Sequence, residues 1–212
     1  RFFGLDAASA EPARRLAALP ELAEALAVCR GARILRQDPW ECLVGFMLSS
    51  CCNVPRIERM VEALCQAAGE RRGGQDGWRA FPAPGALPGE AALRRLGLGF
   101  RARYLSQVNR PETRAWLEGL RRLPFAEARR ELTSLEGVGE KVADCVLLYS
   151  LGFGEAFPVD VWIRRAMQAA YFGGREAPDR EIQALAAERF GRDAGYAQLV
   201  LFHLWRTRRK RA

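Results

Sequence analysis

Lysine is scarce in this basic chain. Of its 33 basic side chains only Lys141 and Lys210 are lysines, and all the others are arginines. Histidine occurs once, at position 203, so imidazole groups cannot assemble a metal site. Arginine stays protonated in proteins, whereas a lysine amine can lose its proton and act as a nucleophile. The retention of Lys141 within the body of the chain therefore indicates a task that arginine cannot perform.

Metal-binding cysteine patterns are missing as well. The chain has six cysteines, but none follows Cys145 and no two are separated by two residues. This spacing argues against a zinc site or an iron–sulfur cluster. We expect no required cofactor, no catalytic metal, and mostly buried thiols in a reducing compartment.

Long apolar runs are also absent. No run approaches the roughly 18 apolar residues of a membrane helix, and Arg1-Phe2-Phe3 does not open a secretory signal. We therefore expect a soluble intracellular protein without a membrane partner. The chain does not begin with methionine, which leaves trimming or a longer parent protein open.

Strand-like alternation does not occur, and apolar residues instead recur at helical spacing, which predicts an all-α fold. Asp38 followed by Pro39 has the pattern of a helix start, and the apolar helix after it is expected to be central to its domain. A short helix around Trp78 is expected within the loop-rich segment Gly69–Gly89. The predicted helices cover Glu11–Val28, Trp40–Ser50, Arg56–Ala68, Ala91–Leu96, a stretch opening at Phe100, Trp116–Leu123, Phe125–Leu135, Val142–Leu151, Asp160–Ala170, Asp179–Phe190 and Ala194–Trp205.

The formal net charge of +8 favours a polyanionic partner such as nucleic acid. Part of this charge lies in a basic tail, residues 206–212, which can equally be a solvated chain end. Phe100 and Arg101 follow a glycine turn and can enter a nucleic-acid groove, although an ordinary half-buried helix start has the same sequence pattern.

The stretch Leu135–Cys145 predicts a helix, a tight hairpin and a second helix. Gly137, Val138 and Gly139 form the hairpin, whose main-chain N–H groups and helix dipole suit a DNA phosphate. Lys141 lies in the first turn of the second helix, where the dipole and partial burial disfavour its protonated form. It is expected to be a nucleophile, or else a phosphate contact.

Asp160 lies one helix and one turn beyond Lys141. Its carboxylate can stabilise positive charge developing at a sugar carbon, or it can simply cap the helix that follows. Cys145 comes one helical turn after Lys141 and so shares its face, which by itself indicates core packing.

Together these motifs resemble the helix-hairpin-helix-GPD superfamily of DNA glycosylases, and within it the 8-oxoguanine DNA glycosylase/AP lyase family. The resemblance covers nearly the whole chain. Besides the hairpin with Lys141 and the run Pro158-Val159-Asp160, it is carried by Phe2–Asp6, Leu35–Pro39 with Glu41-Cys42-Leu43, Ser49-Ser50, Arg56-Ile57, Leu96–Tyr104, and Ala194–Gln198 with Leu201-Phe202.

The resemblance implies a bifunctional enzyme that excises 8-oxoguanine from duplex DNA by base flipping. Lys141 would attack C1′, release the base and form a Schiff base through which β-elimination cuts the strand, and Asp160 would support the charge changes. Cys145 and Phe202 would sandwich the flipped base, and Gln198 would read its Watson–Crick edge. The hairpin would grip phosphate, with a monovalent cation as a possible structural ligand.

The resemblance also implies contacts around the vacated position in the duplex. Phe100 would be the inserted wedge, and Arg101 and Arg56 would contact the orphaned cytosine. Asn53 belongs to the same expected DNA surface, as does Cys51, which stands where the family has an asparagine. A thiol is a poor hydrogen-bonding substitute, so opposite-base discrimination is expected to be loose.

Two further differences from the family pattern concern the site and the domain organisation. Trp162 replaces a family histidine near the catalytic aspartate, and the chain is expected to lack most of the family's N-terminal β-rich domain. The whole chain, 1–212, is expected to be the catalytic region, with one helical subdomain over 30–124 and the helix-hairpin-helix subdomain over 1–29 plus 125–212. The DNA cleft would lie between these subdomains.

The expected protein is a monomer that works on damaged double-stranded DNA inside the cell, in a bacterial nucleoid or a nucleus. Two alternatives remain from the sequence. One is a glycosylase of the same fold for other damaged purines, against which Lys141 argues because hydrolytic members need only the aspartate. The other is a non-catalytic module that binds DNA.

Overall fold

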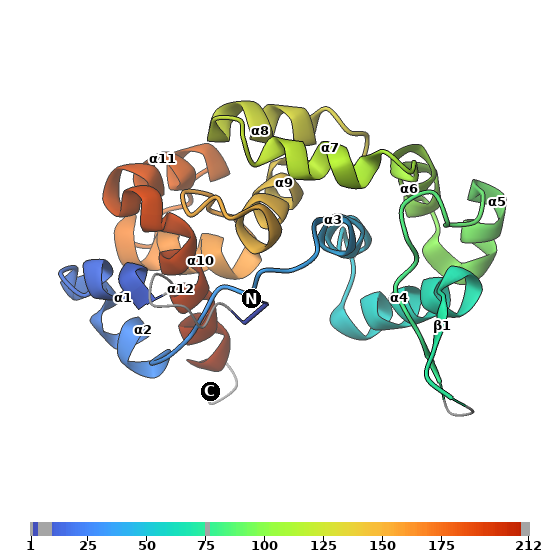
Figure 1. Cartoon of the computed structure of the whole chain (residues 1–212). Coiled ribbons are helices and arrows are strands. Elements are labelled where there is room, and N and C mark those ends of the chain that lie inside the picture. Colours follow the sequence, from blue (N-terminus) through green and yellow to red (C-terminus); the bar gives the residue numbers. More distant parts are fainter. Residues whose placement is uncertain (1, 4–9, 75–76, 209–212) are drawn as a thin grey trace. The chain divides into compact units, whose positions relative to one another are not determined.

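A computed structural model describes residues 2–3, 10–74 and 77–208 of the chain. Helices dominate it (Figure 1), which confirms the predicted all-α fold. They form two compact units, one of residues 37–146 and one of residues 1–36 with 147–212. The subdomain bounds drawn from the sequence stay a prediction, and residues 4–6 and 209–212, used in the family resemblance and the basic tail, lie outside the described residues.

The unit of residues 37–146 holds the hairpin. Its helices are α3 (Pro39–Leu48), α4 (Val54–Ala68), α5 (Glu90–Leu93), the π-helical turn η3 (Arg94–Leu98), α6 (Arg101–Val108), α7 (Thr113–Leu120), α8 (Phe125–Thr133) and α9 (Glu140–Val146).

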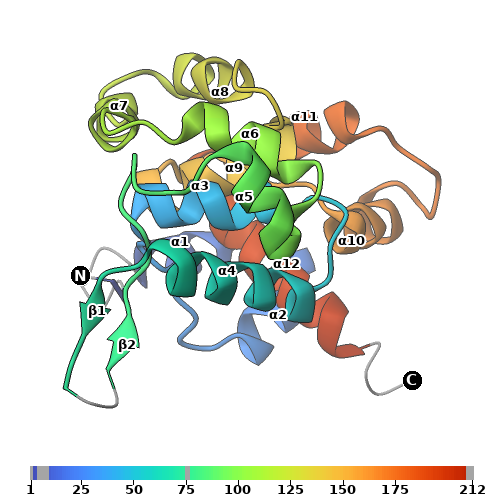
Figure 2. The same ribbon diagram turned by 90° about the vertical axis from the view of Figure 1, so that its right-hand side faces the viewer.

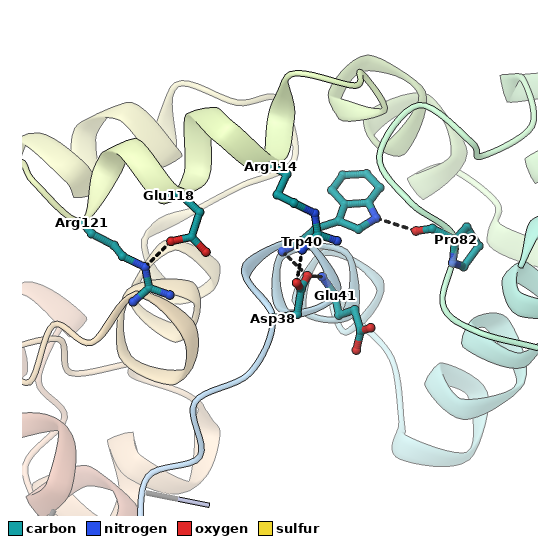
Figure 3. A network of polar contacts seen from close by, with 7 residues as sticks. All are labelled: Asp38, Trp40, Glu41, Pro82, Arg114, Glu118 and Arg121. Atoms are coloured by element: carbon teal, nitrogen blue, oxygen red, sulfur yellow. Dashed lines mark hydrogen bonds and ion pairs between the residues drawn. The ribbon is translucent and has the colours of Figure 1, made fainter. Parts of the chain in front are cut away.

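Helix α3 is central to this unit, as its apolar sequence predicts. The carboxylate of Asp38 accepts hydrogen bonds from the main-chain N–H groups of Trp40 and Glu41, at 3.0 and 3.1 Å, and so caps the helix. Asp38 also forms an ion pair with Arg114 of α7, and the buried Trp40 indole donates to the carbonyl of Pro82 at 2.8 Å (Figure 3). These contacts fix the start of the helix whose other end lies at the site described below.

The predicted helix around Trp78 is wrong. Arg71–Arg72 and Trp78–Arg79 instead pair as two short antiparallel strands, β1 and β2, which extend from the end of α4 (Figure 2). Glycine-rich turn residues favour this ribbon, because a Cβ on Gly77 would lie 2.4 Å from the carbonyl oxygen of Arg72. Strands of two residues are too short for periodicity to reveal them.

The other unit is built around its C-terminal helix. It contains α1 (Glu11–Leu16), the 3₁₀ turn η2 (Pro20–Leu22), α2 (Ala23–Val28), the π-helical turn η4 (Leu147–Leu151), α10 (Val161–Tyr171), α11 (Asp179–Phe190), the 3₁₀ turn η5 (Gly191–Asp193) and α12 (Ala194–Arg208). Helix α12 packs against α2, α10 and α11, and their apolar side chains form one buried core. Each fully buried leucine or isoleucine of this kind contributes about 1.5–3 kcal/mol.

The single helix predicted over Glu11–Val28 is wrong, because the structure divides it. Helix α1 ends at Leu16 and α2 begins only at Ala23. Pro20 lacks a main-chain N–H and forces the preceding Leu19 into an extended conformation, with φ −97° and ψ 107°. The break is therefore a local consequence of one proline.

Within the described ranges, no helix is both long and apolar enough to span a lipid bilayer.

Candidate functional site

The hairpin between α8 and α9 has the conformation that its glycines predict. Gly137 has φ +84°, and a Cβ there would lie 2.4 Å from the ring of Tyr104, so both backbone angle and packing require glycine. The Val138 side chain is buried, which leaves only its main chain for a contact. A Cβ on Gly139 would have no neighbour within 4 Å among the described residues, so that side of the hairpin is open.

Lys141 projects from the first turn of α9 toward the end of α3. Its Nζ donates a hydrogen bond of 3.4 Å to the Ser49 hydroxyl and lies 5.1 Å from the centre of the Phe46 ring. The Ser49 hydroxyl in turn donates to the carbonyl of Phe46 at 2.7 Å, so it offers its lone pairs to the amine. The half-buried lysine is thus aimed by α3 rather than left to solvent.

Arg129 joins α8 to α9 beside this lysine. Its guanidinium donates to both carboxylate oxygens of Asp144, at 2.7 and 3.0 Å, and Glu140 lies 3.4 Å away. Burial alone would lower the pKa of Arg129, but the hydrogen bond and charge of Asp144 outweigh it and raise that pKa overall. Asp144 is only 1% exposed, so this ion pair stabilises a charge that is buried away from water.

Arg129→Met is therefore expected to lower the free energy of unfolding by about 3–5 kcal/mol, since it removes the ion-pair partner of a buried carboxylate. The matched control is Arg164→Met in α10. Arg164 makes the same two-pronged contact with Asp179, at 2.7 and 2.8 Å, but both side chains are about 40% exposed, and the expected loss is at most about 1 kcal/mol. Urea unfolding followed by circular dichroism measures both, and equal losses would contradict the role given to burial.

Three of the predicted DNA-contacting residues meet at the turn after α3. Arg101 is 2% exposed, and its guanidinium donates to the carbonyls of Ser50 and Cys51 and lies 4.4 Å from the centre of the Phe100 ring. Its Nε is buried without a hydrogen-bond partner. Phe100 is 49% exposed, as a wedge residue would be. Cys51 is exposed and has φ +49°, a left-handed conformation that non-glycine residues seldom adopt.

Asn53 and Arg56 lie at the start of α4. The Asn53 side chain accepts a hydrogen bond of 3.1 Å from the main-chain N–H of Arg56 and caps the helix, a function independent of DNA. The exposed Arg56 lines a cavity of about 340 Å³ with Leu96 and Gly97. Its position beside this glycine turn is compatible with the predicted contact, which stays a prediction.

In the other unit, Asp160 and Gln198 are linked through one short segment. Asp160 caps α10, where Oδ1 accepts from the main-chain N–H of Ile163 at 2.8 Å. Gln198 of α12 is 5% exposed, and its Nε2 donates to the carbonyl of Pro158, two residues before Asp160, at 3.3 Å. Trp162 is half-buried in the first turn of α10.

The structure groups some of the predicted site residues and leaves others in separate units. Lys141 and the buried Cys145 belong to the unit of residues 37–146, whereas Asp160, Gln198 and the half-buried Phe202 belong to the other. The cap function of Asp160 is confirmed, and the proposed catalytic and base-reading roles stay predictions.

Sequence reasoning missed three partners. They are Ser49 at the lysine, Arg129 at the second helix of the hairpin, and Tyr149, whose hydroxyl donates to Oε1 of Gln198 at 3.2 Å. Tyr149 left a weak signal, because it is one of only three polar side chains in the mostly apolar run Val142–Leu151, together with Asp144 and Ser150. Among the described residues, no three histidine, cysteine or carboxylate side chains form a group that would hold a metal ion.

Comparisons with known proteins identify relatives of the chain. No protein-family model matches the chain. The chain is 34% identical to a probable N-glycosylase/DNA lyase of Methanothermobacter thermautotrophicus, over 82% of this chain and 63% of that protein. It is 36% identical to an N-glycosylase/DNA lyase of Arabidopsis thaliana, over 86% of this chain and 54% of that protein.

A solved structure extends the similarity to the whole fold. The 8-oxoguanine glycosylase/lyase of Clostridium acetobutylicum, in complex with double-stranded DNA containing cytosine opposite 8-oxoguanine, superimposes with a TM-score of 0.89 at 31% identity. The match covers 100% of this chain and 73% of that one. The fold thus places the chain in the helix-hairpin-helix class of DNA glycosylases. Within this class, the chain belongs to the 8-oxoguanine glycosylase/lyase family. It spans about three fifths or less of the curated relatives named above.

Proposed function

We propose that this chain is the catalytic region of a bifunctional glycosylase/lyase that removes 8-oxoguanine from duplex DNA and then cuts the strand at the abasic site. The observation that carries the proposal is Lys141, held at the first turn of α9 by Ser49 and Phe46 in a family whose named members include lyases. The family membership makes damaged double-stranded DNA the expected partner.

In the proposed mechanism, the nitrogen lone pair of Lys141 attacks C1′ of the damaged nucleotide. The new C–N bond forms as the glycosidic bond breaks, and the base leaves with that electron pair. Asp160 stabilises the positive charge that develops at the sugar. Ring opening then gives a Schiff base, and loss of a C2′ proton expels the 3′ phosphate by β-elimination. Hydrolysis of the Schiff base returns the amine.

The flipped base, in this proposal, stacks between Cys145 and Phe202 while Gln198 reads its Watson–Crick edge. Phe100 fills the vacated position, and Arg56 and Arg101 contact the orphaned cytosine. For Arg101 this requires a change, since its guanidinium is buried against the carbonyls of Ser50 and Cys51. Its unpartnered Nε is a donor that such a rearrangement would satisfy.

The hairpin has a binding role in this proposal. The main-chain N–H groups around Gly139 would bind a DNA phosphate. A monovalent cation would be held by main-chain carbonyls of the turn 135–138, where oxygen donors fit a hard cation and supply no chemical step. We further propose that the protein acts as a monomer, inside the cell, on chromosomal DNA.

Base release and strand cutting test this function. Duplexes carrying 8-oxoguanine, 3-methyladenine or undamaged guanine opposite cytosine are incubated with the protein, and products are separated on denaturing gels with and without alkali. Incision at 8-oxoguanine without alkali is expected. Release of 3-methyladenine alone would support a glycosylase for other purines, and binding without release would support a non-catalytic module.

Cys51→Asn is expected to sharpen the preference for cytosine opposite the lesion about tenfold, because an amide adds a hydrogen bond that the thiol cannot make well. Asparagine also tolerates a positive φ, so the variant should gain up to about 1 kcal/mol in stability. Excision rates opposite each of the four bases, and urea unfolding, measure the two effects. The neighbouring Cys52→Asn is the control, and the hypothesis fails if both variants change discrimination equally.

A further inference from the structure

The side-chain amide of Gln198 is held at both ends. At one end Nε2 donates to the main-chain carbonyl of Pro158 at 3.3 Å. At the other end Oε1 accepts from the hydroxyl of Tyr149 at 3.2 Å. Gln198 is 5% exposed, so water does not readily replace either partner.

These two contacts define which way the amide faces. A carbonyl oxygen can only accept a hydrogen bond, so the group that faces Pro158 must be the NH₂. The oxygen must then face Tyr149, whose hydroxyl can donate to it. A half-turn of the amide would place two hydrogen-bond acceptors against each other at Pro158, so the chemistry of the two partners fixes the orientation of the amide.

A fixed amide distinguishes two kinds of purine edge. One N–H of Nε2 and one lone pair of Oε1 remain for a ligand, and they lie side by side. A guanine-type edge offers the acceptor O6 next to the donor N1–H, whereas an adenine-type edge offers the donor N6–H next to the acceptor N1. A base in a given pose therefore matches only one orientation of the amide, and a freely turning amide would accept both.

Tyr149, which holds the oxygen end of the Gln198 amide, lies in an unusual turn. Tyr149 lies at the middle of η4, where the helix widens to a π-helical turn. Such turns occur often at functional sites because they redirect side chains relative to a regular α-helix. The tyrosine is also far from Gln198 in the sequence, so the contact depends on the folded unit of residues 1–36 and 147–212.

We propose that Tyr149 is a positioning residue that, with the carbonyl of Pro158, locks the Gln198 amide in one orientation and so selects a guanine-type edge against an adenine-type edge. This inference rests on the proposed function, in which Gln198 reads the flipped base. Tyr149 acts through Gln198 and touches neither the sugar nor the glycosidic bond in this account.

Tyr149→Phe tests the proposal. The single-turnover rate of excision is measured for 8-oxoguanine and for 8-oxoadenine, each opposite cytosine. We expect the ratio of the two rates to fall about tenfold, with 8-oxoguanine losing more. Affinity for a duplex with a tetrahydrofuran abasic analogue, which has no base to read, should stay unchanged, whereas general damage to the fold would lower it.

Tyr171→Phe is the matched control in the same unit. The Tyr171 hydroxyl is buried without a hydrogen-bond partner, and burial raises its pKa to about 12. Removing this hydroxyl breaks no hydrogen bond, so the ratio of the 8-oxoguanine and 8-oxoadenine excision rates should be unaffected. In a Gln198→Ala background, Tyr149→Phe should produce no further change, because the residue through which it acts is missing.

The outcomes separate this inference from the function on which it rests. A parent protein that releases neither base refutes the proposed function and this inference with it. A parent that releases 8-oxoguanine, combined with an unchanged ratio in Tyr149→Phe, refutes the inference alone. A ratio that falls equally in Tyr171→Phe, or that falls further in the Gln198→Ala background, also overturns it.

Discussion

Lys141→Gln is expected to abolish strand incision and to slow release of 8-oxoguanine on the order of 10³-fold or more. The reason is that glutamine keeps a polar, unbranched side chain, one atom shorter, but has no nucleophilic amine, so neither the C1′ adduct nor the Schiff base can form. Because Lys141 contacts only the Ser49 hydroxyl and the Phe46 ring among the interactions described, the fold should survive. Denaturing gels measure incision, and circular dichroism checks the fold.

The chain offers a matched control for this variant. Lys210 is the only other lysine, so Lys210→Gln removes the same charge and the same chemical group. It should retain incision. If Lys141→Gln still cuts the strand at the parent rate, the nucleophile is not Lys141, and the lyase mechanism proposed above is wrong.

Asp160→Asn is expected to lower the rate of base release about 10²- to 10³-fold while leaving stability nearly unchanged. Asparagine caps a helix about as well as aspartate, so the hydrogen bond from Ile163 to the side chain of residue 160 is kept. What the variant loses is the negative charge that stabilises the sugar in the transition state. Single-turnover kinetics and thermal unfolding measure the two effects separately.

This substitution decides between the two readings of Asp160 that the sequence left open. Asp160→Ser serves as a second variant, since serine also caps but carries no charge. If both variants keep full activity, Asp160 is a helix cap and nothing more. If both lose stability by several kcal/mol, the residue has a structural role that the cap does not describe.

Local sequence signals predicted the parts of the fold that are governed by local rules. Asp38 followed by Pro39 gave the start of α3 because capping and the fixed φ of proline act within one turn. Gly137 predicted the hairpin for the same kind of reason, since its φ of +84° favours glycine, whereas Gly139 has no such requirement. The division of the segment 11–28 was equally local, and reading Pro20 as an interruption would have predicted it.

The ribbon of β1 and β2 could not be predicted in this way. Each strand has two residues, so no alternation can build up, and the exposed Trp78 resembles a residue of an amphipathic helix. Its pairing depends on the turn between the strands and on the main-chain bond from Ala80 to Glu70 at 2.9 Å. Such contacts form only once the chain has folded back on itself.

The same distinction between local signals and long-range contacts applies to the candidate site. Lys141 and Asp160 could be singled out because residue type and local motif carry their chemistry, and Gln198 through the family resemblance. Their partners could not, since Ser49 is 92 residues from Lys141 and Tyr149 is 49 residues from Gln198. Contacts at such separations follow from tertiary packing, which no local pattern encodes. The buried position of Arg101 is a further example, because arginine in a basic chain is ordinarily expected at the surface.

The most direct test of the account is to trap the covalent intermediate and find where it is attached. The parent protein is incubated with a duplex carrying 8-oxoguanine opposite cytosine, reduced with borohydride, digested, and analysed by mass spectrometry. We expect a sugar adduct on the peptide that contains Lys141 and no adduct on undamaged DNA. An adduct on Lys210 or on the N-terminal amine, or base release without any trapped adduct, would contradict it.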